Sequence, residues 1–148
     1  NNVAHSLMPC GALLGVNVRI GCPEGFEPLS GVLEQARSLA QHGASIEICT
    51  DPVKAVAGAQ AVYTDVWASM GQEDEQAERE AAFAAFCVDK ALMDQASKDA
   101  IVLHCLPAHR GEEISPDVME GASSRIFDQA ENRLHAQQAL LAALMGGL

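Results

Sequence analysis

Short runs of strand-forming residues alternate with helical segments along this 148-residue chain, and no other feature constrains the fold as strongly. Strands that alternate with helices form βαβ units, whose crossover connections place the strands parallel in one sheet. We therefore expect an α/β domain over residues 1–148, with helices on both faces of a parallel sheet. The expected strands are residues 16–20, 45–50, 61–66, 100–103 and 124–127.

The helical segments carry recognisable start and stop signals. Asp51 and Pro52 form an N-cap followed by a first helical residue, and Gly58 ends that short helix. Pro9 lies inside the first helical pattern, where it should kink the helix or mark a late start. The helices are expected at residues 3–14, 29–42, 52–57, 74–86, 90–95, 116–120 and 132–145.

The charge balance excludes several classes of partner. Nine basic and twenty acidic residues give a net charge of −11, which disfavours both nucleic acid and an anionic membrane surface. No apolar run has the length of a transmembrane helix, and the five cysteines form no Cys-x-x-Cys pair, which favours a reduced, intracellular protein. The dinucleotide fingerprint Gly-x-Gly-x-x-Gly is absent, so no nicotinamide or flavin cofactor is expected. The start on a helical pattern without methionine indicates a piece of a longer protein.

A reactive cluster follows the strand at residues 100–103. Ligands of open α/β sheets bind beyond the carboxyl ends of the strands, where this strand delivers Cys105 and three cationic or imidazole side chains. A lone cysteine is usually a small buried hydrophobe, but His104, His109 and Arg110 should lower its pKa and favour a nucleophile, proton acceptor or ligand contact. A zinc site of His104, Cys105 and His109 would lack a fourth ligand and a usual spacing, so no metal is expected.

Asp65 ends another expected strand, and Ser69 follows four residues later. A carboxylate and a hydroxyl in this arrangement can hold an ammonium group through charge-assisted hydrogen bonds. An aspartate that caps the next turn is an equally good interpretation of the spacing.

Two further positions complete a possible site for a small zwitterion. Asn2 opens the first helix, where its amide and free backbone N–H groups could bind a carboxylate, although a plain helix cap is favoured locally. Arg133 opens the last helix, where it could polarise a carbonyl or bind phosphate. The alternative for Arg133 is a surface ion pair, worth about 0–1 kcal/mol.

These motifs together resemble one family. Asn-Asn at 1–2, Asp-x-x-x-Ser-Met-Gly at 65–71, His-Cys-Leu-Pro at 104–107 and Glu-Asn-Arg at 131–133 match, in order and spacing, the carboxyl-terminal domain of ornithine carbamoyltransferases. The combination is specific, because the aspartate-using relatives lack the cysteine. The resemblance implies a three-layer, Rossmann-like fold and a cytoplasmic enzyme of arginine metabolism. Such an enzyme makes L-citrulline and phosphate from carbamoyl phosphate and L-ornithine, usually as a homotrimer.

The resemblance also implies a role for each matching residue. Cys105 would lie beside the δ-amine and the carbamoyl group, and Arg133 would polarise the carbamoyl oxygen. The Leu106–Pro107 peptide bond is expected to be cis, as in the family. The substrate-binding residues would be Asn2 for the ornithine carboxylate, Asp65 and Ser69 with the Met70 backbone for its ammonium, and the Leu106 carbonyl for the carbamoyl nitrogen.

The chain also departs from the family pattern. The Ser-x-Arg-Thr and His-Pro-x-Gln segments of the amino-terminal half are absent, as is the strand that ends in Gly-Asp just before Asn-Asn. We therefore expect the sheet to lack its first, central strand and the chain alone to be inactive. Two alternatives stay open: a non-catalytic amino-acid-binding domain, and a sister carbamoyltransferase that uses another amine. A biosynthetic and a catabolic role are equally compatible with the sequence.

Overall fold

A computed structural model describes residues 1–68 and 76–146 of the chain. The residues divide into two compact units, which are described separately. Unit 1 comprises Asn1–Gly58 and Trp67–Phe86, and unit 2 comprises Ala59–Val66 and Cys87–Leu148. In the described part of the chain, no helix has the combination of length and apolar character needed to cross a membrane.

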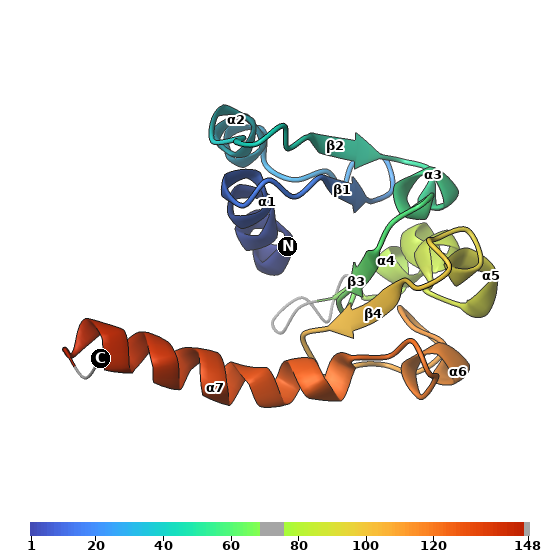
Figure 1. Ribbon diagram of the computed structural model, residues 1–148. Coiled ribbons are helices and arrows are strands. Elements are labelled where there is room, and N and C mark those ends of the chain that lie inside the picture. The colour runs from blue at the N-terminus through green and yellow to red at the C-terminus, as the bar shows by residue number, and fades with distance from the viewer. Residues whose placement is uncertain (69–75, 147–148) are drawn as a thin grey trace. The chain divides into compact units, whose positions relative to one another are not determined.

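Unit 1 is built around a pair of parallel strands, β1 (Val18–Gly21) and β2 (Ile46–Cys49), as Figure 1 shows. Val18 lies opposite Ile46. The helix α1 (Asn2–Leu13) packs against α2 (Ser30–Ser38), and Figure 1 shows the two side by side. The remaining elements are α3 (Pro52–Val56), α4 (Gln76–Phe83) and the 3₁₀ helix η2 (Ala84–Phe86).

The core of unit 1 lies between its two long helices and its strands. Met8 and Ala12 of α1 are fully buried against Ala36 of α2 and Ile46 of β2. A side chain at Gly11 would collide with Val18, so the missing Cβ lets α1 approach β1 closely.

Unit 2 is built around a second parallel pair, β3 (Ala61–Thr64) and β4 (Ile101–His104), in which Thr64 lies opposite His104. Its helices are α5 (Lys90–Met93), α6 (Pro116–Met119) and α7 (Ile126–Leu144). The buried apolar side chains of unit 2 are Val62, Val88, Leu92, Ala100, Val102, Ile114, Val118, Met119 and Ile126.

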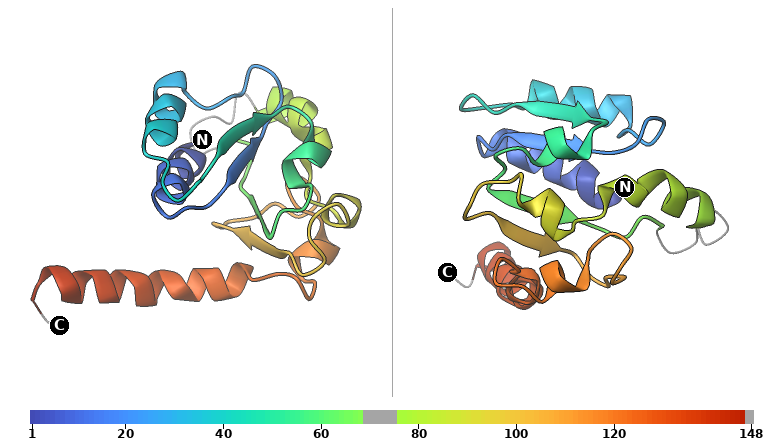
Figure 2. Two further views of the ribbon diagram at one scale, coloured as in Figure 1. Left: turned by 45° about the horizontal axis from the view of Figure 1, so that its top comes forward. Right: turned by 90° about the vertical axis from the view of Figure 1, so that its right-hand side faces the viewer.

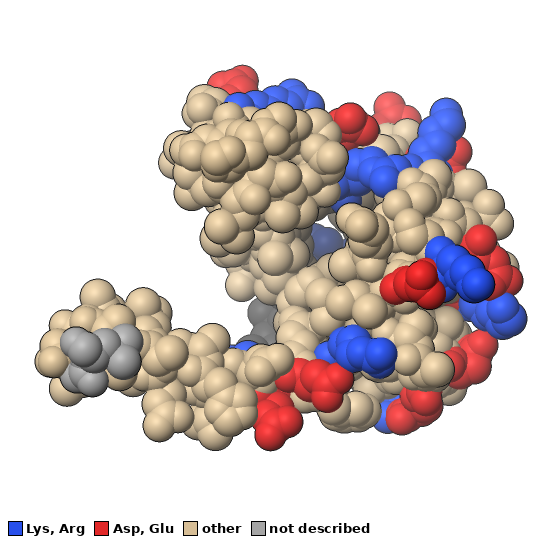
Figure 3. Space-filling model, in the orientation of Figure 1, with Lys and Arg blue, Asp and Glu red and all other residues tan. Residues whose placement is uncertain are grey.

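The long helix α7 is buried only at its beginning. Ile126 is fully buried, whereas residues 131–141 are all exposed. Figure 2 shows α7 as one long, continuous helix. The part of α7 that follows Arg133 carries no lysine, arginine, aspartate or glutamate, and Figure 3 shows it as an uncharged surface. Its exposed apolar side chains are Leu134, Leu140, Leu141, Leu144 and Met145.

The structure confirms the α/β class and the parallel pairing, and it places strands in four of the five expected segments. The described strands pair two by two, one pair in each unit. The expected strand at 124–127 is wrong, because Ser124 forms a single bridge with Val102 and α7 already begins at Ile126. A late start at Pro9 is also wrong, since α1 begins at Asn2 and continues through the proline.

The burial of Met8 leads to a test of the unit 1 core. Met8→Ala should lower the free energy of unfolding by about 2–5 kcal/mol, because it removes buried methylene groups and leaves a cavity. Urea denaturation of the chain measures the change. Leu14→Ala is the matched control, because the Leu14 side chain is 76% exposed and its loss should change stability by no more than about 0.5 kcal/mol. Equal effects of the two substitutions would contradict the assigned core.

Candidate functional site

Asp65 and Cys105 meet at one edge of the β3–β4 pair. Because Thr64 and His104 are opposite each other at the ends of parallel strands, the residues that follow them leave the sheet together. The Cys105 thiol donates to Asp65 Oδ1, with 2.9 Å between sulfur and oxygen. The same oxygen accepts from the backbone N–H of Val66 at 2.8 Å. The structure therefore joins two of the predicted site residues that lie 40 positions apart.

The surroundings of Cys105 keep its sulfur protonated at neutral pH. Burial, followed by the hydrogen bond to Asp65 and the charge of that carboxylate, raises the pKa of the Cys105 thiol to about 11. Interaction with the Tyr63 hydroxyl opposes this rise. Cys105 is therefore a neutral hydrogen-bond donor in this site.

The expectation that neighbouring cations lower the pKa of Cys105 is wrong. The His104 ring contacts Glu113, His109 contacts Glu112, and Arg110 pairs with Glu120. Each cationic or imidazole side chain thus faces a carboxylate of its own, and the thiol instead faces an acidic partner. Sequence proximity did not translate into contact, because successive residues after a strand point in different directions.

His104 is buried and has a partner on each ring nitrogen. Nδ1 accepts from the backbone N–H of Leu106 at 2.8 Å, and Nε2 lies 3.0 Å from Glu113 Oε1. Since Nδ1 accepts, the ring proton resides on Nε2 and is donated to the carboxylate. Possible ligand atoms of Asp65, His104 and Cys105 lie within 4.8 Å of one another, but neither imidazole nitrogen of His104 is free for a metal.

The segment after Cys105 has a special backbone. The Leu106–Pro107 peptide bond is cis, which confirms the expectation. Leu106 has a φ of 59°, a left-handed conformation that is unusual for a residue with a branched side chain. Its N–H is held by His104, so part of this geometry is stabilised by a hydrogen bond within the segment.

Two residues that the sequence did not single out, Gln129 and Tyr63, contact residues of the site. Gln129, in the first turns of α7, accepts from the His104 backbone N–H at 3.0 Å. Its amide nitrogen donates to the Tyr63 hydroxyl at 3.0 Å, and Tyr63 in turn interacts with Cys105. One signal was available for Gln129, because it precedes Arg133 by four residues and therefore shares a helix face with it.

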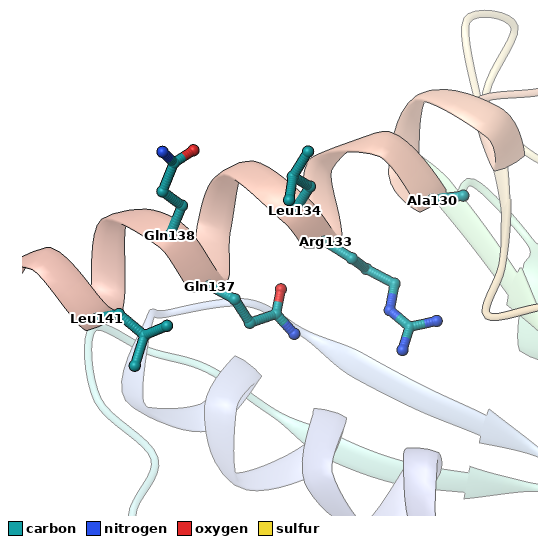
Figure 4. Close-up of a pocket in the computed structure, with 6 residues that line it drawn as sticks. All are labelled: Ala130, Arg133, Leu134, Gln137, Gln138 and Leu141. Carbon is teal, nitrogen blue, oxygen red and sulfur yellow. The ribbon is translucent and has the colours of Figure 1, made fainter.

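Arg133, the other predicted catalytic residue, takes no part in the contact between Asp65 and Cys105. Arg133 is exposed on α7, and it makes no hydrogen bond or ion pair with any residue that the structure describes. Figure 4 shows its guanidinium extending away from the helix. It lines a shallow, open depression formed entirely by α7 residues: Ala130, Arg133, Leu134, Gln137, Gln138 and Leu141.

Asn2, a further predicted site residue, lies in α1 of unit 1. Asn1, not Asn2, caps α1, because its side-chain oxygen accepts from Val3 N at 2.8 Å and from Ala4 N at 3.1 Å. Asn2 is exposed as the first helical residue, so its side chain is not the cap. Ser69 and Met70 lie outside the described residues.

The contact between Cys105 and Asp65 leads to a test of the thiol. Asp65→Asn removes a negative charge that raises the pKa of Cys105, so the pKa should fall and the thiolate fraction at pH 8 should rise. Alkylation of Cys105 by iodoacetamide, followed peptide by peptide with mass spectrometry, should therefore become faster. Asp99→Asn, an exposed substitution, is the control and should leave the rate unchanged. An unchanged rate in Asp65→Asn would rule out this electrostatic coupling.

Comparison with known proteins supports the resemblance seen in the motifs. The family model described as the Asp/Orn binding domain of aspartate/ornithine carbamoyltransferase matches residues 1–144. Ornithine carbamoyltransferases of Parasynechococcus marenigrum (strain WH8102) and Prochlorococcus marinus (strain MIT 9313) are 84% and 73% identical over all 148 residues of the chain. The chain covers 46% of each of these relatives, or about half of their length.

A solved structure shows the same fold. Ornithine carbamoyltransferase from Pyrococcus furiosus superposes with a TM-score of 0.90 at 52% sequence identity, over 97% of this chain and 46% of that protein. The site residues Asp65 and Cys105 thus lie in a fold shared with these enzymes, and the chain belongs to the aspartate/ornithine carbamoyltransferase family, in which it corresponds to the Asp/Orn binding domain.

Proposed function

We propose that this domain binds L-ornithine for an ornithine carbamoyltransferase reaction, in which the δ-amine attacks carbamoyl phosphate to give L-citrulline and phosphate. The observation that carries the proposal is the 2.9 Å contact between Cys105 Sγ and Asp65 Oδ1. It joins the two motifs that together distinguish the ornithine enzymes within the family. The identity of 84% to a relative named ornithine carbamoyltransferase agrees with this choice of amine.

In the proposed complex, Asp65 binds the α-ammonium group of ornithine. Its carboxylate lies beyond the end of β3, where open α/β sheets bind ligands, and a charge-assisted hydrogen bond to an ammonium is among the stronger polar contacts. Ser69 and the Met70 backbone would complete the ammonium site, and Asn2 would bind the carboxylate.

The proton of the attacking amine is the next requirement. An alkylammonium has a pKa near 10.4, so ornithine must lose its δ-proton before it can attack. The raised pKa of Cys105 argues against a thiolate as the acceptor in the free enzyme. We infer that the thiol orients the amine as a neutral partner, and that a phosphate oxygen of the second substrate takes the proton.

Arg133 is proposed to stabilise the oxyanion of the tetrahedral intermediate. A guanidinium offers several donors in a fixed plane, which suits an oxygen that gains negative charge during the reaction. The side chain is exposed and makes no polar contact with any described residue, so it is available to a ligand. The Leu106 carbonyl would accept a hydrogen bond from the carbamoyl nitrogen.

Carbamoyl phosphate itself would be held mainly by the other half of the enzyme. The chain covers 46% of its relatives, and the exposed leucines of α7 offer an apolar surface on which a further part could pack. By the same family resemblance, we infer a trimeric enzyme in the cytoplasm that acts in arginine metabolism.

A chimeric protein tests the proposed reaction. The chain matches 46% of the Parasynechococcus enzyme, and the chimera joins it to the remaining part of that enzyme. Citrulline formation by the chimera is then measured. We expect activity with L-ornithine and none with aspartate or other amines. The 148-residue chain alone should form no citrulline, because it lacks most of the carbamoyl phosphate site. Inactivity of a folded chimera, or preference for another amine, would overturn the proposed function.

Two substitutions in the chimera separate catalysis from amino-acid binding. Asp65→Asn should weaken ornithine binding about 10- to 100-fold, since one charge-assisted hydrogen bond is worth about 1.5–3 kcal/mol. Cys105→Ser should lower kcat while ornithine binding changes less. Isothermal titration and steady-state kinetics measure the two effects. A Cys105→Ser variant with full kcat would favour the alternative, a non-catalytic amino-acid-binding role for this site.

A further inference from the structure

Glu113 is the most deeply buried acidic side chain in the described part of the chain, and the proposed reaction does not yet use it. Glu113 belongs to the segment that connects β4 to α6, and its side chain has no exposed surface. Oε1 accepts two hydrogen bonds, whereas the buried Oε2 has no hydrogen-bond partner among the described residues. A carboxylate that is buried and only half satisfied costs stability, so its place needs another explanation than packing.

The two hydrogen bonds to Oε1 come from opposite ends of one segment. His104 Nε2 lies 3.0 Å from Oε1 at the end of β4, and the backbone N–H of His109 donates to it over 2.6 Å. Between these two residues lies the segment that carries Cys105 and Leu106. One carboxylate oxygen therefore accepts hydrogen bonds from both ends of the segment that contains Cys105 and Leu106.

The carboxylate also determines the protonation pattern of His104. A neutral imidazole can carry its proton on either nitrogen, and an acceptor beside Nε2 selects the Nε2–H form. Nδ1 is then left with a lone pair, which accepts the Leu106 N–H at 2.8 Å. In the other tautomer, an Nδ1–H group would face the Leu106 N–H, and two donors would oppose each other.

Leu106 is the residue whose backbone this arrangement holds. Its φ of 59° is one that a leucine rarely adopts, so the surrounding contacts must maintain it. The backbone conformation of Leu106 decides where its carbonyl oxygen points, and that oxygen is the proposed acceptor for the carbamoyl nitrogen. A shift of about 1 Å in such a group is enough to cost about 100-fold in rate.

From this chain of contacts we infer that Glu113 is a positioning residue for carbamoyl transfer. Its carboxylate holds His104 as the Nε2–H tautomer, and His104 in turn holds the Leu106 backbone beside Cys105. The inference rests on the proposed function, because it assigns the purpose of this support to the carbamoyl end of the site. Asp65, which would bind the α-ammonium end of ornithine, is held by the Val66 backbone N–H as well as by the Cys105 thiol.

The experiment compares three substitutions in the active chimera. Glu113→Met keeps the approximate volume but removes the acceptor, and it should lower kcat about 10- to 100-fold. The dissociation constant for ornithine should change by less than about threefold, because the Asp65 contact is retained. Glu113→Gln keeps an oxygen that can accept both N–H groups, so it should recover most of kcat. Glu112→Met is the matched control, because the Glu112 side chain is 37% exposed and its polar partner among the described residues is the His109 ring.

The kinetic outcomes are distinct. A purely structural role would reduce the amount of folded protein, or weaken ornithine binding and lower kcat together, without rescue by Glu113→Gln. Full kcat in folded Glu113→Met, or equal losses in the methionine and glutamine variants, overturns the inference. Failure of the proposed function looks different, since the unsubstituted chimera would then form no citrulline.

A second measurement does not depend on how Glu113→Met folds. Nitrogen NMR of the unsubstituted chimera, with labelled histidine assigned through a His104→Gln variant, reports the protonation of both ring nitrogens. We expect a proton on Nε2 and none on Nδ1 of His104 at neutral pH. An Nδ1–H tautomer or a doubly protonated ring would overturn the inference even if no kinetic data were available.

Discussion

The parallel register of β3 and β4 is the constraint on which the candidate site depends. Thr64 lies opposite His104, so the chain leaves both strands at the same edge, and Asp65 meets Cys105 directly. The register is itself maintained by burial, since Val102 is fully enclosed in the core of unit 2. A shift by one residue would turn such buried side chains toward solvent and separate the carboxylate from the thiol.

This pairing gives the site an electrostatic character that the neighbouring residues alone do not suggest. Three cationic or imidazole side chains lie close to Cys105 in sequence, yet each is paired with its own carboxylate, and the thiol is raised in pKa by burial and by Asp65. A neutral thiol beside a carboxylate suits the binding of an ammonium ion better than nucleophilic attack. This pair thus agrees with the proposed binding of a charged amino acid, and the proposed reaction then requires a second substrate that supplies its own proton acceptor.

Most elements of the fold follow from local patterns, and the exceptions have a common cause. Four strands and the cap at Asp51 appear where the sequence predicts them, because periodicity and turn residues act over a few positions. The segment at 124–127 differs. Its residues favour a strand, but full burial of Ile126 at the start of α7 is a tertiary contact that outweighs this preference. Pro9 shows the reverse case, a local breaker accommodated inside a helix that packs on a core.

By itself, the sequence determined the α/β class, the family and the candidate residues Asp65 and Cys105, because these depend on residue type and spacing along the chain. Only the tertiary structure decided which side chains touch. It alone revealed Glu113 and Gln129, which support the site from 9 and 25 positions away from His104. It also reversed the expected shift in the pKa of Cys105. The physical reason is that burial and long-range partners set the protonation of a group, and neither is encoded in its immediate neighbours.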